Sequence, residues 1–218
     1  MRNAHQWVNR RHFIASAAAL CLGTLAHAAP PPAHVLILGD SLSAEYGLAR
    51  GTGWVALLDA RLNSSPDSAA TLTNASISGE TTSGGRMRLP ALLKQHQPDV
   101  VVIELGGNDA LRGLPLKGTL ENLRAMTQAA QAAGAKVLLL GIQMPPNYGK
   151  KYAQEFEQLY AQVAKELRVD LVPSFLKGVA DAPNPTVLFQ ADRIHPNAQA
   201  QPIMLGNVLA PLQQLLRP

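Results

Sequence analysis

Cysteine and histidine are both scarce in this sequence of 218 residues. The single cysteine, Cys21, lies in an apolar N-terminal stretch that we expect to be removed. The remaining chain then has no thiol, which excludes disulfide bonds, thiolate metal sites and a cysteine nucleophile. Beyond that stretch only His34, His96 and His195 remain, scattered along the chain. We therefore expect no metal centre, and any chemistry that needs a histidine has three candidates.

Charged residues are also few, at 16%, and no apolar run beyond the N-terminus is long enough to cross a membrane. The formal net charge is +4, but residues 1–28 hold three arginines and no acidic residue, so residues 29–218 carry 4 − 3 = +1. Charges of both signs alternate there, which argues against a nucleic-acid-binding surface. We expect a globular monomer with no nucleic-acid partner and no stable membrane anchor.

Residues 1–28 are typical of a cleaved secretory signal. Arginines precede an apolar run at residues 15–25, and Ala26-His27-Ala28 forms an A-x-A cleavage site. The mature protein then begins at or near Ala29, and residues 29–218 form one domain. Arg10-Arg11-His12-Phe13-Ile14 resembles a twin-arginine export signal, although ordinary Sec export stays open. Both routes predict a periplasmic or secreted protein.

Strands and helices are predicted to alternate along the rest of the chain. The expected strands are 34–38, 71–77, 99–105, 136–142 and 169–172, and the expected helices are 54–62, 81–96, 116–133, 152–167 and 197–216. Such alternation favours right-handed βαβ units and a parallel sheet covered on both faces. We predict an α/β fold of the flavodoxin-like type, a three-layer α/β/α sandwich with a five-stranded parallel sheet in the order 2-1-3-4-5.

A serine follows the first predicted strand directly. Val35-Leu36-Ile37-Leu38 is apolar, Gly39 and Asp40 break it, and Ser41 comes next. Open α/β sheets carry their ligand sites at the carboxyl ends of the strands, so Ser41 is a candidate nucleophile. The alternative is a serine that only caps a helix or forms a turn.

The predicted strand order brings two further loops beside Ser41. Strand one lies between strands two and three, whose ends carry Gly79 and Asn108. The backbone N–H groups of Ser41 and Gly79 and the side-chain amide of Asn108 can therefore point at one oxygen, as in an oxyanion hole. Taken singly, Gly79 could be a turn glycine with positive φ and Asn108 an ordinary turn residue.

A base is found by elimination among the three histidines. His34 begins a strand and His96 lies at a polar helix end, so we expect both to be solvated. His195 stands in Asp192-Arg193-Ile194-His195-Pro196. Asp192 can bond the Nδ1–H group of His195 and leave Nε2 for the serine. The alternative is a turn that caps the last helix.

These motifs together resemble the sequence blocks of the GDSL (SGNH) hydrolases, over residues 34 to about 205. The resemblance is closest to the periplasmic acyl-CoA thioesterase I/lysophospholipase/arylesterase group. It implies the SGNH hydrolase fold, no cofactor, and small acyl ester or thioester substrates. It also implies that Ser41 is the nucleophile, His195 the base, Asp192 its orienting acid, and Ser41, Gly79 and Asn108 the oxyanion donors. The blocks are Gly39-Asp40-Ser41-Leu42-Ser43, Gly79, Gly107-Asn108-Asp109 and Asp192-x-x-His195.

Two predicted loops, 110–115 and 143–149, could accommodate an acyl chain. Leu111, Met144 and Pro145 are the candidate contacts, although surface packing would also explain them. The chain departs from the pattern of similar enzymes at two positions: Glu45 replaces a small residue and Arg193 replaces a glycine. Because both residues are charged, the preference for anionic substrates does not carry over from the resemblance.

The sequence thus predicts a serine ester hydrolase that cleaves acyl esters and thioesters through an acyl-enzyme on Ser41. A carbohydrate O-deacetylase using the same site is one alternative. A non-catalytic flavodoxin-like periplasmic binding protein is another.

Overall fold

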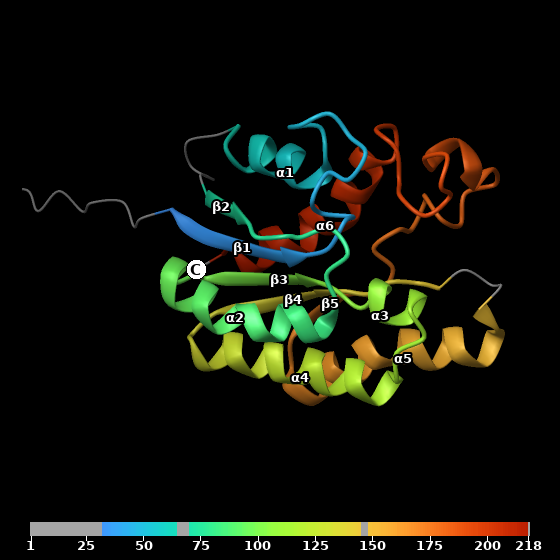
Figure 1. The fold of residues 1–218 in the computed structure, drawn as a ribbon. Coiled ribbons are helices and arrows are strands. Elements are labelled where there is room, and N and C mark those ends of the chain that lie inside the picture. The colour runs from blue at the N-terminus through green and yellow to red at the C-terminus, as the bar shows by residue number, and fades with distance from the viewer. Residues whose placement is uncertain (1–31, 65–69, 145–147, 218) are drawn as a thin grey trace, which may run out of the picture. The chain divides into compact units, whose positions relative to one another are not determined.

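The computed structural model describes residues 32–64, 70–144 and 148–217. The predicted signal and Pro145 lie outside these ranges. The elements, in chain order (Figure 1), are β1 (Ala33–Gly39), α1 (Trp54–Leu62), β2 (Ala70–Asn74), α2 (Thr82–His96), β3 (Val100–Glu104), α3 (Gly107–Leu111), α4 (Leu116–Ala132), β4 (Lys136–Leu140), α5 (Lys150–Leu167), β5 (Asp170–Val172), the 3₁₀ helix η3 (Pro185–Leu188) and α6 (Gln201–Leu215).

The five strands form one parallel sheet in the order β2-β1-β3-β4-β5. This order confirms the predicted topology. Gly39 at the end of β1 is in register with Glu104 at the end of β3, so both strands end at the same edge of the sheet. The segments that follow β1, β2 and β3 therefore emerge side by side, with the β1 segment in the middle.

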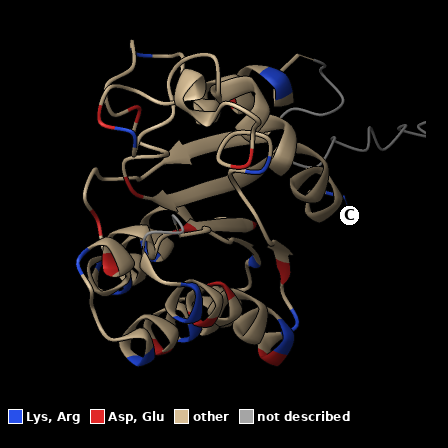
Figure 2. Cartoon of the chain, turned by 90° about the vertical axis from the view of Figure 1, so that its right-hand side faces the viewer, with Lys and Arg blue, Asp and Glu red and all other residues tan. Residues whose placement is uncertain are grey.

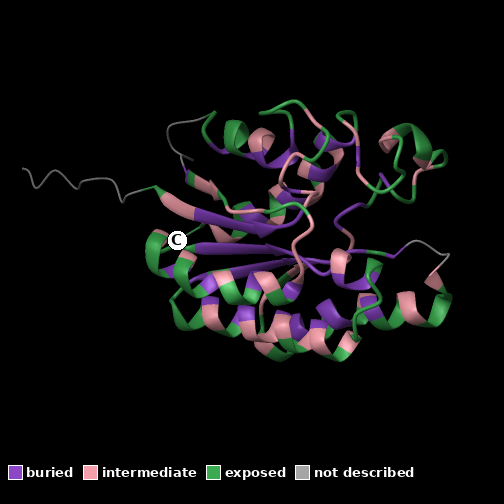
Figure 3. Ribbon diagram, viewed as in Figure 1, coloured by how far each residue is buried: buried purple, intermediate pink, exposed green. Residues whose placement is uncertain are grey.

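Helices cover both faces of the sheet, with α2, α4 and α5 on one side and α1 and α6 on the other (Figure 1). Alternate residues of a strand point to opposite faces. Leu36 and Leu38 accordingly pack in one core cluster with the first helix layer, whereas Val35 and Ile37 pack in the other. The inner strands β1, β3 and β4 are mostly buried, and the helices turn their exposed sides outward (Figure 3). A sheet buried on both faces explains why its strands are continuous apolar runs.

Three elements differ most from the prediction: β2, α6 and α3. Strand β2 ends at Asn74 because the Asn74 side chain turns the chain, accepting from Ser76 N and donating to Ser43 O. Helix α6 begins at Gln201, after a turn in which Ala200 N donates to Asn197 O. The five-residue helix α3 was predicted as a loop, because it is too short for a periodic pattern.

Charged residues of both signs are interspersed along the helices, as Figure 2 shows from the side toward which the strands point. Among the described residues, no helix is both long enough and apolar enough to span a membrane.

Candidate active site

Three polar side chains from distant parts of the chain meet beyond the carboxyl end of β1. Ser41 Oγ lies 2.8 Å from His195 Nε2, and His195 Nδ1 lies 2.6 Å from Asp192 Oδ2. Ser41 follows β1, whereas Asp192 and His195 lie in the loop between η3 and α6. The structure thus brings together the three residues that the sequence suggested as nucleophile, base and orienting acid.

The loop that carries Asp192 and His195 is held by its own hydrogen bonds. Asp192 Oδ1 accepts from the backbone N–H groups of Ile194 at 2.9 Å and His195 at 3.0 Å. Burial raises the pKa of Asp192, but hydrogen bonds from the His195 ring and from these two N–H groups outweigh it and bring the pKa to about 2. Asp192 is therefore ionised at neutral pH and fixes the orientation of the His195 ring. The ring of Tyr46 packs on the imidazole, with centroids 4.3 Å apart.

The segments that follow β1, β2 and β3 each carry one of the three predicted oxyanion donors. In the described part of the chain, the backbone N–H groups of Ser41 and Gly79 have no acceptor. Asn108 Nδ2 donates one hydrogen to Asp40 Oδ2 at 2.9 Å, which leaves its second hydrogen available. Gly79 has φ +79° in a turn closed by Glu80 N donating to Ile77 O, a conformation that glycine adopts without strain. Gly79 is therefore a turn glycine whose own N–H is free.

A pair of buried carboxyl groups lies beneath the serine, and sequence reasoning missed it. Asp40 is 2% exposed and Glu104 is fully buried. Glu104 Oε2 accepts from Ser43 Oγ at 2.7 Å and from Asp40 N at 3.2 Å. The available signal was a lone glutamate that ends an otherwise apolar strand.

Burial dominates the electrostatics of this pair. It raises the pKa of Asp40 to about 6, against hydrogen bonds from Leu42 N and Asn108 that lower it. Burial also raises the pKa of Glu104 well above its usual value, and the nearby Asp40 raises it further. Burial therefore favours the neutral form of both carboxyl groups, and hydrogen bonds from Leu42 N and Asn108 oppose this at Asp40. The Asp40 carboxyl group faces the Asn108 amide.

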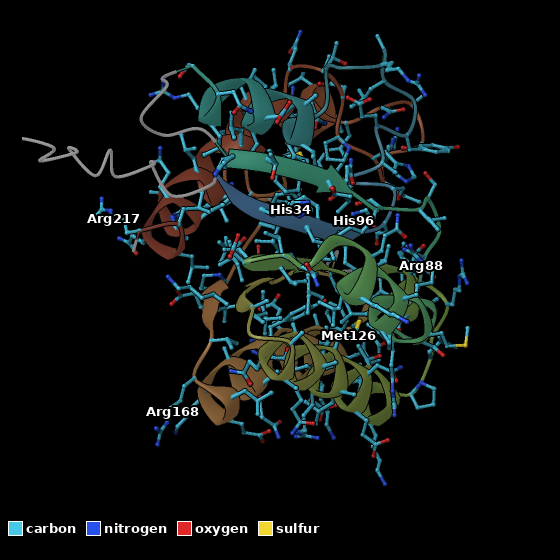
Figure 4. All side chains as sticks on the ribbon, turned by 90° about the vertical axis from the view of Figure 1, so that its left-hand side faces the viewer. His34, Arg88, His96, Met126, Arg168 and Arg217 are labelled. Atoms are coloured by element: carbon cyan, nitrogen blue, oxygen red, sulfur yellow. The ribbon has the colours of Figure 1, made fainter. Side chains whose placement is uncertain are left out.

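The other two histidines lie at the opposite edge of the sheet. Figure 4 views the molecule from the amino ends of the strands, where His34 and His96 are labelled. Ser41 instead follows the carboxyl end of β1. Our expectation that both are solvated was wrong. Each is half-buried, and the His34 ring is within hydrogen-bonding distance of His96 O, at 2.8 Å, and Thr73 Oγ1, at 2.9 Å. These bonds use both ring nitrogens of His34 for structure.

A cavity of about 540 Å³ opens beside Ser41 and His195. Leu111 and Met144 line it, as the sequence suggested, while Pro145 lies outside the described residues. Arg193 also lines it, with φ +58°. Glu45 does not line it, because its carboxylate accepts from Gly51 N and Gly53 N in a neighbouring loop. Most of the remaining wall is apolar and includes Leu42, Ile142, Leu176, Pro185, Phe189 and Ile194.

Within the described residues, no three histidine, cysteine, aspartate or glutamate side chains lie close enough together to hold a metal ion. The chemistry that this geometry supports is nucleophilic: a serine beside a histidine that an ionised aspartate orients, with free donors next to the serine.

Comparison with known proteins identifies the family. Residues 37–202 match the model of the GDSL-like lipase/acylhydrolase family. The chain belongs to this family. The chain is 50% identical to Esterase TesA of Pseudomonas aeruginosa over 182 residues, which cover 84% of this chain and 89% of that protein. It is 46% identical to Thioesterase 1/protease 1/lysophospholipase L1 of Escherichia coli K12, covering 84% of each. The protein is thus a GDSL-family hydrolase of the esterase/thioesterase type.

Solved structures agree with this assignment. The psychrotrophic esterase EstA from Pseudoalteromonas sp., in a form inhibited by monoethylphosphonate, superposes with a TM-score of 0.77. It is 41% identical, and the match covers 84% of this chain and 98% of that one. The SGNH hydrolase fold that the sequence predicted is therefore confirmed.

Proposed function

We propose that this protein cleaves small acyl esters and thioesters through an acyl-enzyme on Ser41. The observation that carries the proposal is the chain of contacts from Ser41 Oγ to His195 Nε2 at 2.8 Å and from His195 Nδ1 to Asp192 Oδ2 at 2.6 Å. A serine hydroxyl is a weak nucleophile until an adjacent base accepts its proton. The neutral imidazole supplies that base when Nδ1–H donates to Asp192 and the free Nε2 faces the serine.

In the acylation step, Ser41 Oγ attacks the carbonyl carbon while His195 Nε2 takes the hydroxyl proton. The carbonyl oxygen becomes an oxyanion, and the N–H groups of Ser41 and Gly79 and the second hydrogen of Asn108 Nδ2 stabilise it. These donors act in the transition state, when the charge develops. His195 then gives its proton to the departing alcohol or thiol, which leaves an ester on Ser41.

In the deacylation step, His195 removes a proton from water, and the resulting hydroxide attacks the ester carbonyl. The same three donors hold the second oxyanion, because the carbonyl oxygen has not moved. Collapse of that intermediate returns the proton from His195 to Ser41 Oγ and releases the carboxylic acid. Asp192 stays ionised in both steps, in keeping with its lowered pKa.

The mostly apolar wall of the cavity beside Ser41 supports an acyl chain as its occupant. Leu111 and Met144 are the proposed contacts, and Pro145 is proposed from the sequence alone. The names of the relatives support esters, thioesters and lysophospholipids as substrates. We also propose export by the N-terminal signal, action in the periplasm or outside the cell as a monomer, and a mature chain of residues 29–218.

A chain-length series of p-nitrophenyl esters tests this function. The mature protein should hydrolyse the series, and Ser41→Ala should abolish turnover without unfolding the protein. Activity confined to the acetyl ester and to acetylated sugars would favour a carbohydrate O-deacetylase. A folded wild-type protein with no turnover on any ester would favour a binding protein.

A further inference from the structure

Arg112 follows α3 on the surface and takes no part in the chemistry described above. Its Nη2 donates to the carbonyl oxygen of Gly79 at 2.8 Å. Its own backbone N–H donates to the carbonyl oxygen of Asn108 at 3.2 Å. One exposed residue is therefore bonded to both of the residues that supply oxyanion donors from outside the serine loop.

A second attachment joins the same two segments on the buried side. Asp109, which is 2% exposed, accepts from the backbone N–H of Thr82 at 2.8 Å and from the Thr82 hydroxyl. Thr82 begins α2, three residues after Gly79. The segment that follows β2 and the short helix α3 are thus joined inside by Asp109 and outside by Arg112.

The Gly79 turn is open on its outer side, and α3 is short. A methyl group placed at Gly79 would meet only one atom within 4 Å, Nη2 of Arg112 at 3.5 Å, so no other side chain packs on that side of the turn. Helix α3 has only five residues, which is too short to be stable without its contacts. The distance between the Gly79 N–H and the Asn108 amide therefore depends on the bonds that cross between the two segments.

We propose that Arg112 is a positioning residue that sets the separation of the Gly79 and Asn108 donors in the oxyanion hole. This inference rests on the proposed function, in which those donors stabilise the oxyanion. Misplacing such groups by about 1 Å can cost on the order of 100-fold in rate. Arg112 acts only through hydrogen bonds to backbone oxygens, so its loss loosens the donors without removing them.

The experiment compares Arg112→Ala, Arg112→Lys and Arg86→Ala, using a neutral p-nitrophenyl ester as the substrate. Arg86 is a matched control: it is exposed, and its Nη1 donates to the side-chain oxygen of Asn122 at 3.1 Å and not to Gly79 or Asn108. We expect Arg112→Ala to lower kcat about tenfold, less than the 100- to 1000-fold that follows removal of a whole donor. The KM and the melting temperature should change little, because an exposed hydrogen bond contributes little to either.

Arg112→Lys should recover part of the lost kcat, since one ammonium hydrogen can still reach Gly79 O, and Arg86→Ala should match the wild type. Both acylation and deacylation use the same donors, so kcat reports the effect whichever step is slower. An anionic thioester measured in parallel should show the same loss in kcat.

An unchanged kcat in Arg112→Ala would overturn the inference. So would a rise in KM for the anionic thioester alone, because it would show that Arg112 binds substrate charge. A further variant, Asn108→Ala, distinguishes failure of the positioning role of Arg112 from failure of the proposed function. A large loss of kcat in Asn108→Ala with none in Arg112→Ala refutes only the positioning role, whereas no loss in either variant refutes the oxyanion site itself.

Discussion

Replacing Asp40 by asparagine is a sensitive test of how the site is oriented. Asp40 uses both carboxylate oxygens as acceptors, Oδ1 for Leu42 N at 3.0 Å and Oδ2 for Asn108 Nδ2 at 2.9 Å. Asparagine has only one side-chain oxygen. If that oxygen stays with Leu42, an amide nitrogen faces Asn108, and Asn108 must turn its own oxygen toward it. The hole would then lose a donor.

Two effects of opposite sign follow from this one substitution. Removal of one oxyanion donor lowers kcat by about 100-fold or more. The substitution also removes a loss of stability at neutral pH, because burial raises the pKa of Asp40 from 3.8 to about 6. A carboxyl with a raised pKa in the folded state holds its proton more tightly there, so its stabilising contribution is complete below pH 3.8 and is lost as pH rises through 6. Over the whole titration, the free energy of unfolding therefore falls by about 3 kcal/mol on account of Asp40.

The assay combines kcat at pH 8 with urea unfolding at pH 4 and pH 7.5, for wild type, Asp40→Asn and the surface control Asp59→Asn. We expect Asp40→Asn to be folded and nearly inactive. Between pH 4 and pH 7.5 its free energy of unfolding should fall by about 2 kcal/mol less than that of the wild type. The control should resemble the wild type. An Asp40→Asn variant with normal kcat would refute the argument that Asp40 orients Asn108.

Three further predictions concern the site and the N-terminus. Asn108→Ala should lower kcat by on the order of 100- to 1000-fold with little change in KM, whereas a turn residue without a catalytic role would lose about 1 kcal/mol of stability and keep its kcat. N-terminal sequencing of protein recovered from the periplasm should start at or near Ala29, and a retained N-terminus or a lipid on Cys21 would contradict this. Activity should survive dialysis against a chelator, and inactivation that zinc reverses would argue against the serine mechanism.

Much of the fold could be predicted because the strands are short apolar runs bounded by turn residues. Val35 to Leu38 and Val100 to Ile103 are buried on both faces of the sheet, which leaves no polar positions to confuse the pattern. The strand order followed from the alternation with helices. The prediction failed at α3, where five residues are too few to show a helical period.

The meeting of Ser41 and His195 could be proposed only through topology and elimination, since 154 residues separate them. The elimination pointed to His195, which lies beside Ser41, but it did not foresee that His34 is half-buried and hydrogen-bonded at the opposite edge of the sheet. The buried pair of Asp40 and Glu104 was not predicted. A carboxyl group that ends a strand has no periodic signature, and its burial is set by packing around it in three dimensions.

Fluorophosphonate labelling followed by peptide mapping tests the central claim most directly, because the reagent phosphonylates only a serine that a base has activated. The account predicts a single adduct, on Ser41, formed by the mature protein. It also predicts that the adduct disappears in folded Ser41→Ala and forms much more slowly in His195→Ala. An adduct that persists in Ser41→Ala, or that maps to Ser43 or Ser78, would show that the nucleophile lies elsewhere.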